Sequence, residues 1–325
     1  MNKLIAVLIF FVIVSSYSQD TKPQLSITID DPNIESTGNL TWSQKDDALL
    51  ETLDKQGIKA ALFVCGKRID NAEGKVLLSK WNDKGHMISN HSYSHSYFHS
   101  KKISLDVFEN DFLRCDSIIN NYSGYSKLFR YPYLKEGDTP EKRNGFRIFL
   151  HDLGYNQGYV TIDASDWYID SRAVDTLKVN PGLDLTPYKE YYISHIYGRA
   201  MFYDSLAVKL TGRHIKHTLL LHHNFINAQF LGELLNHFSK NGWELINASD
   251  AFKDEIFSKA PDILPAGESI VWALAKETGR FENKLRYPAE DGVYEAEPLN
   301  KYLEEYTKQK KQFNFNHYIN KIIFL

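Results

Sequence analysis

The polar clusters of this chain come directly after short apolar segments. The apolar segment 25–29 ends at Asp30 and Asp31, and the apolar segment 217–221 ends at His222. Segments with helical spacing lie between such stretches, and this strand–helix order predicts a parallel sheet. In an α/β barrel the carboxyl ends of the strands meet at one face, where the functional site lies. The sequence therefore predicts an α/β barrel in which these clusters converge.

The spacing of apolar residues predicts the helices. Ser43 and Asp46 are spaced as a capping box, and Gly57 follows the helix that they would begin. Apolar residues recur three or four positions apart over 104–120, so this helix buries one face. Further helices are predicted around 76–84, 145–153, 188–210 and 231–241, and further strands around 60–64, 128–133, 158–162 and 243–246.

His91 and His95 are four residues apart. They share one face if the segment is helical, and both imidazoles can then reach one divalent metal ion, as in the H-E-x-x-H motif of metalloproteases. No glutamate follows His91, so a general base must come from elsewhere in the chain. On its own, the spacing favours two unconnected histidines, just as Asp30 and Asp31 alone favour an ordinary acidic turn.

Composition and charge limit the partners and the compartment. The net charge of −3 over 325 residues gives no reason to expect nucleic acid or an anionic membrane as partner. Lys3, the apolar run 4–14, and small residues at Ser16 and Ser18 predict a secretory signal over 1–18, with an uncleaved anchor as the alternative. The mature protein is then exported, periplasmic or extracellular, without stable membrane insertion. Two cysteines, Cys65 and Cys115, are expected to be buried free thiols.

After about residue 250 the strand–helix pattern decays, and prolines interrupt it. We therefore divide the chain into the signal, a main domain over 19–250, and a C-terminal extension over 251–325 that packs on the barrel. No role follows from the sequence for 172–213 or for the extension. The lysines at 308, 310 and 311 are interpreted as a solvated face.

Taken in order, the polar clusters resemble those of the polysaccharide deacetylases, the family four carbohydrate esterases with the NodB homology domain. All five motifs stand in the family's order between about residues 25 and 250. They are Asp30-Asp31, His91-x-x-x-His95, Arg130-x-Pro132-Tyr133, Asp163-x-x-Asp166-Trp167 and Leu220-x-His222. The resemblance implies a distorted (β/α) barrel of the polysaccharide deacetylase type, to which the C-terminal extension is added.

The resemblance also implies the first half of a catalytic site. Asp31, His91 and His95 would bind one divalent metal ion, Zn²⁺ by default, with Co²⁺, Ni²⁺ or Fe²⁺ as alternatives. Asp30 would be the general base, and Arg130 would orient this carboxylate and lower its pKa. The backbone N–H of Tyr133 would help to hold the oxyanion.

The remaining motifs imply the acid and the substrate pocket. His222 would be the general acid, with Asp166 paired to it, and the position of His222 in the motif favours it over the neighbouring His223. Trp167 and Leu220 would form the walls of a pocket for the acetyl methyl group, while Asp163 would shape the turn. Pro32 and Asn33 stand where the family usually has glycine and then proline, so the loop after the two aspartates is expected to differ.

These expectations describe a secreted, metal-dependent enzyme that hydrolyses acetyl groups, N-acetyl first of all, from a glycan. Peptidoglycan, chitin-type oligomers, acetylated plant glycans and exopolysaccharide all fit an exported enzyme of this kind. Two alternatives stand beside it: a deacylase of a small non-sugar amide, and a non-catalytic carbohydrate-binding or cell-envelope protein on the same scaffold. The complete set of metal ligands, base and acid argues against the non-catalytic alternative. The oligomeric state stays open.

Overall fold

A parallel β-sheet forms the centre of the molecule. The structure is a computed structural model that describes residues 22–285 and 292–323, so the predicted signal over 1–18 lies outside the described residues. The strands lie in the order β6-β4-β3-β2-β1-β7, and β8 pairs with β1. Their bounds are Gln24–Asp30 for β1, Ala61–Val64 for β2, Met87–Asn90 for β3, Tyr125–Phe129 for β4, Asn156–Gln157 for β6, Lys216–His222 for β7 and Glu244–Leu245 for β8.

Strand β1 shows why the sheet has an apolar and a polar face. Its side chains alternate, with Leu25, Ile27 and Ile29 in the main hydrophobic core. The alternate residues are Ser26 and Thr28, whose hydroxyls donate to backbone carbonyls of β7 at 3.0 and 2.8 Å. The polar face of β1 therefore leads to Asp30 at the carboxyl end of the strand.

The segment that follows β6 joins the two edges of the sheet. Gly158 donates its N–H to the carbonyl of Phe129 at the end of β4, at 2.6 Å. Four residues later, Ile162 forms an isolated parallel bridge with Leu219 of β7. The sheet thus curls until this segment links its opposite edges, and the predicted distorted barrel is confirmed.

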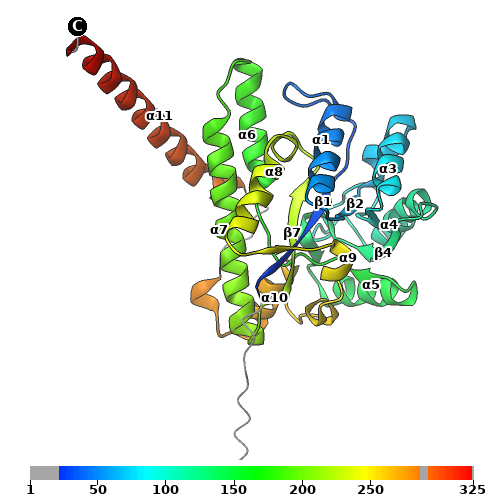
Figure 1. The fold of residues 1–325 in the computed structure, drawn as a ribbon. Coiled ribbons are helices and arrows are strands. Elements are labelled where there is room, and N and C mark those ends of the chain that lie inside the picture. The colour runs from blue at the N-terminus through cyan, green and yellow to red at the C-terminus, as the bar shows by residue number, and fades with distance from the viewer. Residues whose placement is uncertain (1–21, 286–291, 324–325) are drawn as a thin grey trace, which may run out of the picture.

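Helices surround the curled sheet (Figure 1). One start differs from its prediction: α1 begins after Thr41, which forms a capping box with Gln44, whereas Ser43 lies inside the first turn and bonds to Asp47. The helix bounds are Trp42–Lys55 (α1), Gly66–Ile69 (α2), Ala72–Asp83 (α3), Leu105–Ile119 (α4), Pro140–Asp152 (α5), Asp166–Val179 (α6), Thr186–Thr211 (α7), Phe225–Lys240 (α8), Ala248–Ala251 (α9), Ile270–Glu277 (α10) and Gly292–Ile323 (α11), with 3-10 turns at Pro132–Leu134, Glu255–Ser258 and Glu282–Lys284.

The region after residue 250 adds a small sheet and two helices. Strand β9 (Ala266–Gly267) pairs antiparallel with β5 (Lys135–Gly137), and α10 packs against α7. Helix α11 begins beside α6 and α7 and then extends away from the body of the molecule (Figure 1). Lys310 pairs with Asp184 at 2.8 Å, with both side chains about half exposed. The division of the chain at residue 250 stays a prediction.

Two further findings bear on the sequence predictions. Cys65 and Cys115 are free and buried, as predicted. Within the described residues, the structure contains no helix long and apolar enough to span a membrane.

Candidate active site

The two adjacent aspartates meet at the carboxyl end of β1. Asp30 is the last residue of the strand, and Asp31 follows in the left-handed conformation, with φ of 58°. This turn lets both carboxylates reach the same cavity, although successive residues of a strand point to opposite faces. Asn33 helps to hold the turn, because its side-chain amide donates to the carbonyls of Asp31 and His223, both at 3.0 Å.

His91 and His95 lie in the loop that follows β3, so the segment that joins them is not helical. Ser92 and His95 adopt left-handed conformations, with φ of 64° and 56°, which break any helical turn. The loop is held by its own hydrogen bonds, from Ser92 N–H to Asn90 Oδ1 and from His95 N–H to Ser92 Oγ. It places the centres of the two imidazole rings 5.0 Å apart.

Asp31, His91 and His95 form a cluster suited to a divalent metal ion. One ligand atom from each residue lies within 4.8 Å of the others. Asp31 Oδ1 is buried and accepts no hydrogen bond, although it forms an ion pair with Arg68 Nε at 3.2 Å. His91 Nδ1 lies 2.8 Å from the carbonyl of Arg130, so it carries the proton and leaves the Nε2 lone pair for the metal.

The protonation states of this cluster also suit a metal. Burial lowers the pKa of both His91 and His95 to about 4, so both imidazoles are neutral at pH 7. Burial raises the pKa of Asp31, but His95, His91 and Arg68 outweigh that effect and hold it below its usual value. One carboxylate and two neutral imidazoles are the ligand forms that a divalent metal ion requires.

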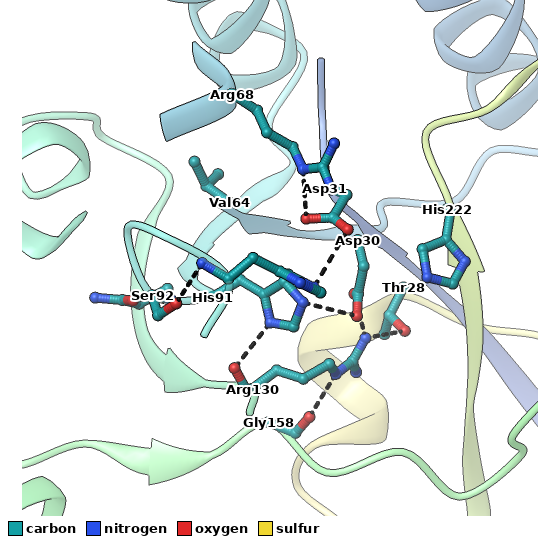
Figure 2. Close-up of polar contacts among 12 residues, drawn as sticks. Thr28, Asp30, Asp31, Val64, Arg68, His91, Ser92, Arg130, Gly158 and His222 are labelled. Atoms are coloured by element: carbon teal, nitrogen blue, oxygen red, sulfur yellow. Dashed lines mark hydrogen bonds and ion pairs between the residues drawn. The ribbon is translucent and has the colours of Figure 1, made fainter. Parts of the chain in front are cut away.

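Asp30 is held by a buried arginine. Arg130 Nη1 lies 2.6 Å from Asp30 Oδ1, while Arg130 Nε donates to the carbonyl of Gly158 at 2.9 Å (Figure 2). The guanidinium also lies 3.8 Å from the ring centre of Phe63. Burial raises the pKa of Asp30 to about 6 and outweighs the lowering by Arg130 and His222. Arg130 thus lowers this pKa as expected, yet burial sets the net direction.

His222 ends β7 and pairs with Asp166, the first residue of α6. Its Nδ1 lies 2.8 Å from Asp166 Oδ1, and its backbone N–H donates to Asp166 Oδ2 at 2.8 Å. The amides of Asn224 and Asn227 also donate to Oδ2. Burial lowers the pKa of His222, but Asp166 outweighs it, and the net pKa rises to about 9. His222 therefore carries a proton at neutral pH.

His223 points away from this cluster. Its Nε2 lies 3.3 Å from Asp46 Oδ1, and its ring lies against Trp81. It is buried and does not line the cavity, whereas His222 does. Of the two neighbouring histidines, only His222 is placed to exchange a proton with a molecule in the cavity.

The cavity has a volume of about 270 Å³. Its lining contains every predicted site residue except Arg130 and Asp166, which lie behind Asp30 and His222. Leu220 packs with Leu134 and Val160 in a small apolar cluster. Tyr133 is 44% exposed, and the centre of its ring lies 4.6 Å from that of His95, so this tyrosine borders the entrance of the cavity. Asp163 also lines the cavity.

Arg68 is a site residue that was not predicted from the sequence. Arg68 lies in α2, lines the cavity, and places Nε 3.2 Å from Asp31 Oδ1. Its place shortly after β2 was a usable signal, because β2 ends at the same face as β1 and β3. Lys45 was also missed: its buried ammonium donates to Asn33 Oδ1 at 2.8 Å and so supports the turn after Asp31.

Part of this chain is similar to known proteins. The sequence model of the family described as polysaccharide deacetylase matches residues 17–148. A peptidoglycan-N-acetylglucosamine deacetylase from Bacillus cereus is 28% identical over 114 residues, which cover 34% of this chain and 37% of that protein. The predicted resemblance to the polysaccharide deacetylases is therefore confirmed over the N-terminal part of the chain, which spans about a third of the length of this relative. The matched region contains the motifs up to Arg130 and Tyr133, while Asp166 and His222 lie beyond it.

A solved structure shares the fold. It is a mutant of a CE4 family pseudoenzyme from Bacillus anthracis. It is 16% identical to this chain, has a TM-score of 0.50, and covers 72% of this chain and 68% of its own. A peptidoglycan deacetylase from Bacillus subtilis is 20% identical with a TM-score of 0.47, over 71% and 91% of the two chains. The similarity to the pseudoenzyme structure concerns the fold alone and gives no information about activity.

Proposed function

We propose that this protein is a metal-dependent hydrolase that removes acetyl groups, N-acetyl first of all, from a glycan. The observation that carries the proposal is the meeting of three groups at one cavity: the Asp30 carboxylate, the Asp31–His91–His95 cluster, and the His222–Asp166 pair. Amide hydrolysis requires a base for the attacking water, stabilisation of the oxyanion, and an acid for the departing amine.

Asp30 is suited to be the base. Arg130 binds its Oδ1, so Oδ2 is the oxygen that can accept a proton from water. Gly158 and Thr28 hold the arginine in turn, and this fixes the orientation of the carboxylate. A pKa of about 6 keeps Asp30 ionised at neutral pH while leaving it basic enough to take a proton.

His222 is suited to be the acid. Asp166 binds Nδ1, so the opposite nitrogen, Nε2, presents its proton to the leaving amine. Asp166 is itself held by three other donors, two of them asparagine side chains, so the imidazole keeps one orientation. Base and acid are then separate residues on neighbouring strands, β1 and β7.

Asp31, His91 and His95 would hold the divalent metal ion, with zinc as the default. Such an ion supplies Lewis acidity toward the acyl oxygen and lowers the pKa of water. The backbone N–H of Tyr133 would donate to the same acyl oxygen. Trp167 and Leu220 would enclose the acetyl methyl group in the apolar part of the cavity.

The substrate class is proposed from the family. The Bacillus cereus relative is described as acting on peptidoglycan N-acetylglucosamine, so peptidoglycan is the first substrate to test. An exported location, from the signal predicted over 1–18, would bring the enzyme to such a polymer. A structural neighbour is described as a pseudoenzyme, so the fold alone does not secure activity; the complete set of base, acid and ligands favours an enzyme.

The test is acetate release by the metal-loaded protein from peptidoglycan, chitin oligomers, an acetylated plant glycan and a small N-acetyl amide. We expect release from at least one N-acetylated glycan and much less from the small amide. Release from the small amide alone would favour a deacylase of non-sugar substrates. No release from any substrate, by folded and metal-loaded protein, would favour a binding protein.

The pH dependence of kcat/KM follows from the two pKa values. Asp30 acts when deprotonated, so activity falls as the pH drops through about 6. His222 acts when protonated, so activity falls as the pH rises through about 9. A cation bound beside Asp30 would lower the pKa of this carboxylate. The pH at which activity falls on the acid side should therefore be about 6 or lower. Initial rates between pH 4.5 and 10.5 should give a bell, and His222→Ala should lose the basic limb.

A further inference from the structure

The first turn of α11 is joined to the start of α6 by a buried carboxylate. Glu295 is 2% exposed, and its Oε1 accepts a hydrogen bond from Ser165 Oγ at 2.7 Å. The guanidinium of Arg199, on α7, binds the same oxygen. Glu295 Oε2 lies 3.7 Å from His195 Nε2. A residue near the end of the chain thus holds two helices of the barrel.

Ser165 is bound to α11 instead of capping its own helix. It stands at the N-cap of α6, where a serine side chain ordinarily accepts a hydrogen bond from a backbone N–H of the first turn. Here the side chain makes no such bond and donates to Glu295. The start of α6 is therefore held by a residue of another helix, 130 positions later in the sequence.

A second contact from α11 reaches the same turn of α6. A Cβ at Gly292 would lie 2.9 Å from Tyr168 Cδ2 and 3.3 Å from Trp167 Cη2. The backbone of α11 thus packs directly on these two rings, and a Cβ at this position would require them to shift. Glu295 and Gly292 together contact three residues of the segment 165–168.

This segment carries two residues of the candidate active site. Asp166 lies between the two contacts and binds His222, and Trp167 lines the cavity. We propose that Glu295 is a positioning residue, which acts through Ser165 to fix the first turn of α6 and so places Asp166 and Trp167 in the site. The C-terminal helix is then part of the catalytic unit. The catalytic half of this inference rests on the proposed function.

Ser165→Ala is the sharpest test. This substitution removes the hydrogen bond to Glu295. It removes no helix-capping bond, because the Ser165 hydroxyl does not cap α6. It also leaves the buried Arg199–Glu295 pair intact, whose disruption would threaten folding. The control is Tyr302→Phe, which removes the hydrogen bond of 3.0 Å between α11 and Glu190 on α7, away from the site.

Two measurements separate positioning from general stability. Hydrogen exchange at Tyr168 and Ile169, whose N–H groups bond to the carbonyl of Ser165, should become about tenfold faster in Ser165→Ala and stay unchanged in Tyr302→Phe. The kcat/KM for acetate release should fall about tenfold or more, because small displacements of positioned groups are costly. The basic limb of its pH profile should move to lower pH, which a smaller folded fraction cannot cause.

A double-mutant cycle with Glu295→Gln completes the test. The losses should be less than additive, because the link between Ser165 and Glu295 can be lost only once, while the single loss in Glu295→Gln also includes its weakened pair with Arg199. Additive losses, or wild-type exchange and kcat/KM in Ser165→Ala, would overturn the inference. If wild type releases no acetate while exchange rises only in Ser165→Ala, the proposed function fails and the structural link from Glu295 to α6 stands.

Discussion

Asp30→Asn is expected to lower kcat/KM for acetate release by about 10²–10⁴-fold, the range for loss of a general base. The side-chain amide can still accept the hydrogen bond from Arg130, so the fold and the metal cluster should persist. It cannot take a proton from water, and this removes the step that Asp30 is proposed to perform. The measurement is acetate release at pH 7.5, with metal content determined on the same samples.

The matched control is Asp163→Asn, because Asp163 is a buried carboxylate on the same cavity to which no chemical step is assigned. It should retain kcat/KM within about tenfold of wild type, which is smaller than the loss of a general base. If Asp30→Asn kept wild-type activity, or if Asp163→Asn lost as much, the assignment of the base would be wrong.

The second large effect is expected on metal content. His91→Ala combined with His95→Ala leaves Asp31 as the sole protein ligand of the cluster, so stoichiometric metal binding should be lost. Acetate release should fall to background with it. The measurement is metal per protein by elemental analysis after dialysis against buffer with trace zinc, with folding followed by circular dichroism.

His99→Ala is the control for this double variant. His99 follows the same loop, but its Nε2 is bound to the carbonyl of Ala266 at 2.8 Å, outside the cluster. It should keep a full complement of metal. Retention of metal by the His91→Ala, His95→Ala protein would place the metal elsewhere and refute the ligand assignment.

The convergence of the site could be predicted from the sequence, because it follows from strand ends. Alternation along β1 and the parallel strand order bring Asp30 and His222 to one face, and the registers pair these two residues directly. Most helices and strands were also predictable, since burial imposes their apolar spacing, but the strand predicted over 158–162 is wrong: β6 covers only Asn156–Gln157, and Ile162 forms an isolated bridge. The roles proposed for the residues came from the family resemblance, and the structure adds their distances.

The rest depends on geometry that spacing does not encode. His91 and His95 converge through left-handed residues in a loop, where the four-residue spacing had suggested a helical turn. The raised pKa of Asp30 reflects a competition between burial and Arg130, and only the folded structure fixes its outcome. The hydrogen bond between Ser165 and Glu295 joins distant parts of the chain, so no local sequence pattern predicts it.

The central claim is that this site hydrolyses an acetyl amide on a glycan. The most direct measurement incubates the metal-loaded protein with N-acetylated peptidoglycan fragments and chitin oligomers, and quantifies acetate and new primary amine in the same samples. The proposal predicts that acetate and amine appear in a one-to-one ratio with wild type and fall together in Asp30→Asn. Folded, metal-loaded wild-type protein that yields neither product from any of these glycans would contradict it.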